Sequence, residues 1–123
     1  MAKHNNIGSW GEQIACETLI RKGYAIRERN WKLDKFEIDI IAMHNNRLIF
    51  VEVKTRSRSH DEALEAVNRK KIMKMVRAAH AYVQTNDIPH EIQYDIITIA
   101  GEPTNYSIEH IEDAFLAPLR NIR

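Results

Sequence analysis

Two apolar runs of strand length, joined by a short polar link, constrain the fold of this chain more than any other feature. In the stretch 36-FEIDIIAMHNNRLIFVEVKTR-56, the first run covers residues 36–43 and the second covers residues 48–55. The link, residues 44–47, contains two consecutive asparagines, which tolerate the left-handed backbone conformations of tight hairpin turns. The sequence therefore predicts two antiparallel strands paired at the centre of a sheet.

Four ionisable side chains interrupt these apolar runs: Glu37 and Asp39 in the first, and Glu52 and Lys54 in the second. If the two asparagines form the turn, a constant register places Asp39 opposite Glu52 and Glu37 opposite Lys54. Two directly opposed carboxylates destabilise a sheet unless a proton or a cation neutralises them. Charges are rarely admitted to core strands without a partner, so the pattern favours a cation between Asp39 and Glu52.

Hard oxygen ligands from Asp39 and Glu52, joined by water and by a backbone carbonyl, that of Val53, suit Mg²⁺ or Mn²⁺ better than zinc. Such an ion lowers the pKa of a bound water and offsets the charge that builds up on a phosphodiester in its transition state. Lys54 would stabilise that charge or orient the nucleophile. The alternative is structural: a Glu37–Lys54 salt bridge beside two solvated carboxylates.

Around this hairpin, the pattern predicts one α/β domain over residues 1–123, with a core from about 8 to 100 and an extension over 101–123. Its mixed sheet is expected to be flanked by helices in the order α-β-β-β-α-β-β. The expected elements are a helix over 10–22, strands over 24–31, 36–43 and 48–55, a helix over 61–84 capped by Asp61, and strands over 93–100 and 106–111.

The composition excludes several classes of protein. A length of 123 residues suits a single domain. No apolar run reaches the roughly 18 residues of a membrane span, and the N-terminus lacks the apolar core of a signal peptide, so we expect a cytoplasmic protein with no membrane partner. Cys16 is the only cysteine, which excludes an intramolecular disulfide and a cysteine-based zinc site.

Positive charge is concentrated after the second strand of the hairpin. Between Lys54 and His80 there are eight basic residues and three acidic ones. This excess predicts a polyanionic partner, whereas the alternative is an ordinary solvated helix face. The residues expected to bind phosphates are Arg56, Arg58, Arg69, Lys70, Lys71 and Lys74, with Arg77 on the same helix.

Three blocks of the sequence carry a resemblance: 11-GEQIACETLIRKGYAIRERNW-31, 37-EIDIIA-42 and 49-IFVEVKTR-56. Together they are similar to the YraN-like family of bacterial endonuclease-like proteins, within the PD-(D/E)xK superfamily, and they resemble archaeal Holliday-junction resolvases. The resemblance covers about residues 8–99, and its blocks fall in order at suitable separations.

The resemblance implies a restriction-endonuclease-like fold and Mg²⁺- or Mn²⁺-dependent cleavage of DNA, including branched or structured DNA. RNA stays open as a substrate, and a homodimer would suit paired cuts. By position, Asp39 and Glu52 would bind metal and Lys54 would be the catalytic lysine. Glu12 would complete the site from the first helix, although it also fits a capping box with Ser9. The alternatives are a nucleic-acid-binding module without catalysis and a scaffold protein that binds neither DNA nor metal.

Two positions depart from the family pattern. Ile38 stands where the superfamily's name has proline, and Phe36 stands where many family members have glycine. Glu37, between them, is expected to support Lys54 or the metal ligands rather than to bind metal. Asp95, a charge inside the fourth strand, is expected either to be structural or to support the metal ligands without binding the metal.

Overall fold

The computed structural model describes residues 6–57, 59 and 68–114. The elements are α1 (Asn6–Arg21), β1 (Ala25–Leu33), β2 (Phe36–His44), β3 (Arg47–Arg56), α3 (Arg69–Asn86), β4 (Glu91–Glu102) and β5 (Asn105–Ile111). The strands form one sheet in the order β1-β2-β3-β4-β5, in which only the β3–β4 pair is parallel. The predicted order α-β-β-β-α-β-β is therefore confirmed. No helix in the described part is long and apolar enough to cross a membrane.

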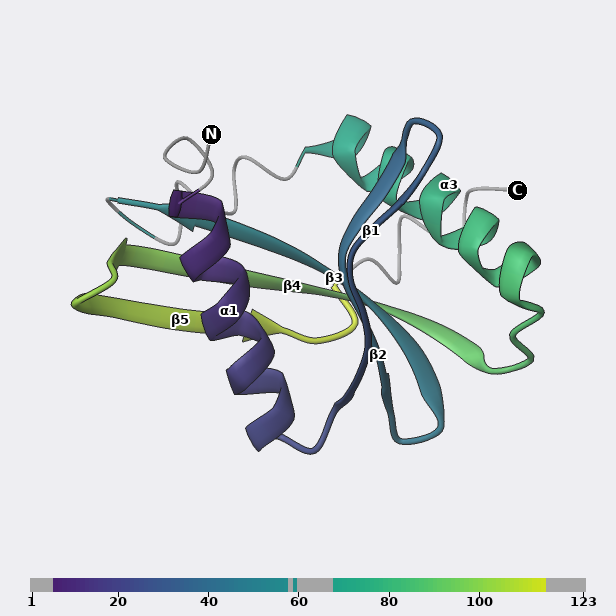
Figure 1. The fold of residues 1–123 in the computed structure, drawn as a ribbon, viewed down its shortest axis with the longest axis horizontal. Helices are drawn as coiled ribbons and strands as arrows, with labels where there is room; N and C mark the ends of the chain where they lie inside the picture. Colours follow the sequence, from purple (N-terminus) through teal and green to yellow (C-terminus); the bar gives the residue numbers. More distant parts are fainter. Residues whose placement is uncertain (1–5, 58, 60–67, 115–123) are drawn as a thin grey trace.

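The two helices pack on opposite faces of a strongly twisted sheet (Figure 1). Alternate residues of β3 point to opposite faces, so Phe50 packs beneath α3 while Ile49 and Val51 pack beneath α1. Tyr82 of α3 is fully buried against Phe50. The crossover through α3 is what allows β3 and β4 to run parallel.

The helix α1 begins earlier than the sequence predicts. It starts at Asn6, so Ser9 lies inside the helix, and the capping box proposed for Ser9 and Glu12 is wrong. The helix ends in a Schellman motif, in which Gly23 has a φ of +94° and the N–H groups of Gly23 and Tyr24 donate to carbonyls of the last turn. Because α1 begins three residues before Ser9, the Glu12 side chain does not pair with an N-cap at Ser9.

The helix α3 begins later than predicted. Asn68 has an extended backbone, with φ −94° and ψ 176°, and its side chain accepts a hydrogen bond from the N–H of Lys71, as an N-cap does. A continuous helix over 61–84 is therefore wrong. Residues 60–67, with the predicted cap Asp61, lie outside the described residues.

The β2–β3 hairpin follows the prediction near its turn. Asn45 and Asn46 both have left-handed backbones, with φ 50° and 63°. His44 lies opposite Arg47, and the same register continues along the strands. The sequence thus predicted both the turn and the register that the turn sets.

Candidate active site

The strand β2 separates from β3 at Asp39. The last pair between these strands is Ile40 with Val51, so the predicted direct pairing of Asp39 with Glu52 is wrong. Instead, Oδ2 of Asp39 accepts a hydrogen bond of 2.8 Å from the backbone N–H of Val53. The Asp39 side-chain oxygen thereby satisfies the Val53 N–H, which lies beyond the last β2–β3 pair.

A rotation of β2 accounts for this separation. Ile38 packs beneath α3 and Ile40 packs beneath α1, although residues two apart on a regular strand share a face. Asn30 lies between the β1 residues that pair with Ile38 and Ile40, and it has a left-handed φ of 50°. Both strands therefore change direction at the point where Asp39 leaves the ladder.

Glu37 lies on the far side of this bend. It pairs with Lys32 of β1, and the predicted pairing with Lys54 is wrong because β2 no longer follows β3 there. Lys54 instead forms an ion pair of 3.2 Å with Glu52 on its own strand, and both side chains are about one-fifth exposed. Glu52 and Lys54, the two predicted residues of β3, therefore lie together, whereas Glu37 is not part of this group.

The Asp39 carboxyl group lies among other charges. Burial, followed by the nearby carboxylate of Glu52, raises the pKa of Asp39 to about 7, although the hydrogen bond from Val53 opposes the shift. The charge of Glu12 acts in the same direction as that of Glu52. The carboxylates of Glu12 on α1 and Glu52 on β3 thus both act on Asp39 of β2, and a cation placed beside Asp39 would be stabilised.

The approach of α1 to β3 depends on Gly11. A Cβ atom added to Gly11 would collide with Oγ1 of Thr55, so the helix can lie this close only because the residue has no side chain. Glu12 follows directly and is partly buried. This contact places the Glu12 carboxylate at the end of the sheet that holds Asp39.

Lys71, in the first turn of α3, meets Lys54. Contact with Lys54 lowers the pKa of Lys71. Burial lowers the pKa of Lys54, but contacts with Lys71 and Glu52 outweigh it, so that pKa is raised overall. Two amines in contact would be stabilised by a shared anion such as a phosphate. The sequence predicted Lys71 only as one of several phosphate-binding cations, and no sequence feature distinguished it from the others.

The other predicted basic residues lie around this point. Arg56 is partly buried and donates to the carbonyl of Thr55, while Arg69, Lys70 and Lys74 are exposed on α3. Arg58 lies outside the described residues. The exposed cations of α3 are free to contact phosphates near the acidic group.

The donors at this point fit a hydrated divalent cation. Among the described residues, no three acidic, histidine or cysteine side chains are already arranged as a metal site. Mg²⁺, however, commonly binds through one or two carboxylates and keeps several waters. Asp39 and Glu52, with the Val53 carbonyl as a further hard donor, match that chemistry. The charge crowding at Asp39 favours a cation there.

Asp95 lies in a different polar cluster, beneath α1, that the sequence did not reveal. It accepts hydrogen bonds from the Tyr24 hydroxyl at 3.0 Å, the Gln93 amide at 2.9 Å and the N–H of Asp113 at 3.0 Å. Nε2 of His110 lies 2.7 Å away. Burial raises the pKa of Asp95, but these contacts outweigh it and hold the pKa below its ordinary value. The predicted structural role fits this arrangement.

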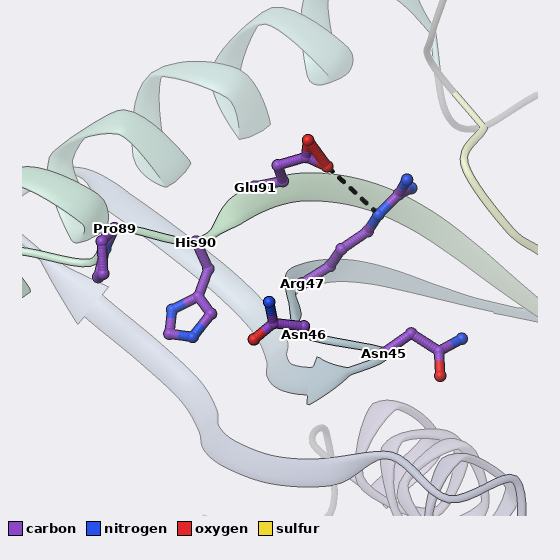
Figure 2. Close-up of a pocket in the computed structure, with 6 residues that line it drawn as sticks. All are labelled: Asn45, Asn46, Arg47, Pro89, His90 and Glu91. Atoms are coloured by element: carbon purple, nitrogen blue, oxygen red, sulfur yellow. Dashed lines mark ion pairs between the residues drawn. The ribbon is translucent and has the colours of Figure 1, made fainter.

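A pocket of about 620 Å³ lies at the turn end of β3 (Figure 2). Arg47, which lines it, is the first residue of β3, whereas Glu52 and Lys54 lie further along the strand. Inside it, Nε of Arg47 lies 3.7 Å from the carboxylate of Glu91. The lining residues are Asn45, Asn46, Arg47, Pro89, His90 and Glu91. Because it opens at the other end of the strand, this pocket is separate from the candidate active site.

The fold and the site define a mixed α/β protein with acidic and basic side chains gathered where its central hairpin splits. A family model described as "Uncharacterised protein family UPF0102" matches residues 11–99. The chain is 47% identical over 120 residues to a UPF0102 protein of Bacteroides thetaiotaomicron, covering 97% of this chain and 99% of that protein. It is also 47% identical over 116 residues to a UPF0102 protein of Flavobacterium psychrophilum, covering 94% of this chain and 98% of that protein. The protein belongs to the UPF0102 family, and the predicted resemblance to YraN-like proteins is confirmed at this level.

Proposed function

We propose that this protein is a Mg²⁺- or Mn²⁺-dependent endonuclease of the PD-(D/E)xK superfamily that hydrolyses phosphodiester bonds in DNA. One observation carries the proposal: Asp39 leaves the β2–β3 ladder beside Glu52, with the ion-paired Lys54 and then Lys71 next to it. The Asp39 carboxyl group is crowded by other carboxylates, and beside it two amines, those of Lys54 and Lys71, lie near the single carboxylate of Glu52. A metal ion and a phosphate together would neutralise both.

The reaction assigns a role to each side chain. Asp39 and Glu52, with the Val53 carbonyl, would hold the ion, which supplies an activated water and charge neutralisation when bound. Lys54 and Lys71 would contact the non-bridging oxygens and stabilise the charge that develops on them. Water attacks phosphorus and one bridging P–O bond breaks, so the products are one phosphate monoester and one hydroxyl group.

The element order supports a restriction-endonuclease-like fold, and the cations of α3 support DNA as the substrate. Arg69, Lys70 and Lys74 are exposed on the same helix as Lys71, where they could hold phosphates that flank the cut. Binding through such contacts weakens as salt rises because it depends on counterion release. We therefore infer a salt-sensitive, sequence-independent component of DNA binding.

A nucleic-acid-binding module without catalysis is the second candidate. It is favoured by the Glu52–Lys54 ion pair, which already engages one of the expected metal ligands. In that case, DNA would bind through the same cations, and no divalent metal would yield a product.

The test incubates the protein with labelled linear duplex, single-stranded and four-way-junction DNA in Mg²⁺, Mn²⁺ or EDTA. Asp39→Asn is the active-site variant, because it removes the charge but keeps an oxygen for the Val53 N–H. Glu91→Gln, an exposed carboxylate at the other end of the sheet, is the matched control. Metal-dependent product from wild type and Glu91→Gln, but not from Asp39→Asn, would establish the nuclease. Salt-sensitive binding without product in any metal would establish the binding module.

A further inference from the structure

A groove of about 430 Å³ lies between the tip of the β1–β2 hairpin and α3. Figure 1 shows this hairpin reaching beside the helix. The hairpin turns through Asp34, whose φ is 54°, and the following residues form one side of the groove. The lining residues are Lys35, Phe36, Glu37, Lys74 and Arg77.

The groove carries a net positive charge. Its three cations, Lys35, Lys74 and Arg77, are exposed. Over residues 6–57, 59 and 68–114, the structure gives none of them an ion pair. Three cations against the single carboxylate of Glu37 leave an excess that phosphate oxygens would neutralise.

Phe36 adds an aromatic ring to these cations. It is partly buried, packs against the core beneath α3 and also lines the groove. Proteins hold single-stranded nucleic acid by combining cations that contact its phosphate backbone with aromatic rings that stack on its bases. A base inside a duplex is already stacked on its neighbours and cannot use such a ring. Glu37 could accept a hydrogen bond from the amino group of an unpaired cytosine or adenine.

The groove adjoins the candidate active site through two elements. Along α3, the helical rise places Lys74 about 4.5 Å and Arg77 about 9 Å beyond Lys71. Along β2, Phe36 lies three residues before Asp39, about 10 Å in a strand. A nucleic acid held at the active site would therefore reach the groove within a few nucleotides.

We propose that this groove binds an unpaired nucleotide close to the scissile phosphate. The substrate class is therefore DNA with a single-stranded branch, such as a fork or flap, rather than uninterrupted duplex. This inference rests on the proposed function, because it takes the Asp39–Glu52 region as the point of cleavage. It also assigns a role to the aromatic ring of Phe36.

The test uses forked DNA with 2-aminopurine at successive positions of the single-stranded arm, in EDTA to prevent cleavage. We expect binding of wild type to change the emission of a probe near the branch point, and Phe36→Leu to remove that change while keeping apolar packing. Phe36→Leu should weaken binding of the fork roughly tenfold, a typical loss for one base–aromatic stack. Binding of a fully paired duplex should stay within about twofold of wild type.

A second set of variants is independent of Phe36 and of its packing. Lys74→Gln combined with Arg77→Gln should weaken fork binding more than Lys70→Gln combined with Arg69→Gln, which removes equal charge from exposed positions outside the groove. Equal losses on fork and duplex, or a fork preference that survives both sets of variants, would overturn the inference alone. Failure of wild type to bind or cut any DNA would overturn the proposed function as well.

Discussion

Two aspartates of the same sheet, Asp39 and Asp95, have opposite surroundings. Asp95 is fully buried and is surrounded by donors from Tyr24, Gln93 and the backbone, with the His110 ring beside it. Asp39 receives one backbone hydrogen bond and lies near two other carboxylates. The pKa of Asp95 is lowered, whereas that of Asp39 is raised to about 7.

Under the proposed function, the difference separates a structural carboxylate from one that binds metal. Donors supplied by the protein stabilise the charge of Asp95, so its ionised form strengthens the fold. The charge of Asp39 accepts one backbone hydrogen bond and lies near Glu52 and Glu12, so a proton or a bound cation would stabilise it further. Substitutions that remove each charge should therefore have opposite effects on activity and stability.

The largest expected effect is on catalysis at Asp39. We expect Asp39→Asn to reduce the cleavage rate by more than about 100-fold, because loss of even an outer partner of a metal ligand commonly costs 10- to 100-fold. The same change should leave the free energy of unfolding unchanged or higher, since it removes a poorly stabilised charge. Initial cleavage rates and urea unfolding measure the two quantities. A variant that unfolds more easily would show that Asp39 is mainly structural.

At Asp95 we expect the opposite pattern, a large loss of stability with little loss of activity. Asp95→Asn should lower the free energy of unfolding by about 2–4 kcal/mol, because hydrogen bonds to a charged acceptor contribute about 1.5–3 kcal/mol each and the amide cannot accept at both of its positions. Thermal unfolding measures the loss. In the cold, where the variant is still folded, cleavage should remain within a few-fold of wild type. A large loss of activity in folded protein would contradict the separation of the two aspartates.

A smaller effect on catalysis is expected from Lys71 of α3, and a still smaller one from its neighbour Lys70. Lys71→Gln should slow cleavage roughly tenfold or more, since it removes a cation in contact with Lys54. Lys70→Gln removes the same charge from an exposed position and should change the rate less than about threefold. Single-turnover kinetics with saturating protein would separate an effect on the cleavage rate from an effect on DNA binding. Equal losses in the two variants would reduce Lys71 to a general phosphate contact.

The smallest expected effect is the dependence of stability on pH. Because the pKa of Asp95 in the folded protein lies below its ordinary value of 3.8, its contribution to stability is complete above that value. It is lost as the pH falls through the folded pKa. Urea unfolding below about pH 4 should therefore show a steeper loss in wild type than in Asp95→Asn. The groups facing Asp95 that must be considered are Tyr24, His110 and, through Tyr24, Glu112. Parallel curves would show that Asp95 is not the titrating group.

Features of the fold that depend on local sequence were predictable. The hairpin at Asn45 and Asn46 was one, because the turn needs residues that tolerate left-handed backbones and the flanking runs alternate or stay apolar. The end of the first helix was another: it was predicted at residue 22 and lies at Arg21, just before Gly23, which tolerates the left-handed backbone of the cap. The start of α3 was not, because the periodic pattern continues through residues that the extended Asn68 separates from the helix.

The sequence by itself determined the order of elements, the central hairpin and the presence of Asp39, Glu52 and Lys54 within it. Only the tertiary structure decided that β2 turns away at Asp39, that Lys71 meets Lys54 and that Asp95 is surrounded by donors. The physical reason is range. Turn chemistry and side-chain periodicity act between residues close in the chain, whereas strand separation and charge contacts depend on packing between elements far apart in it.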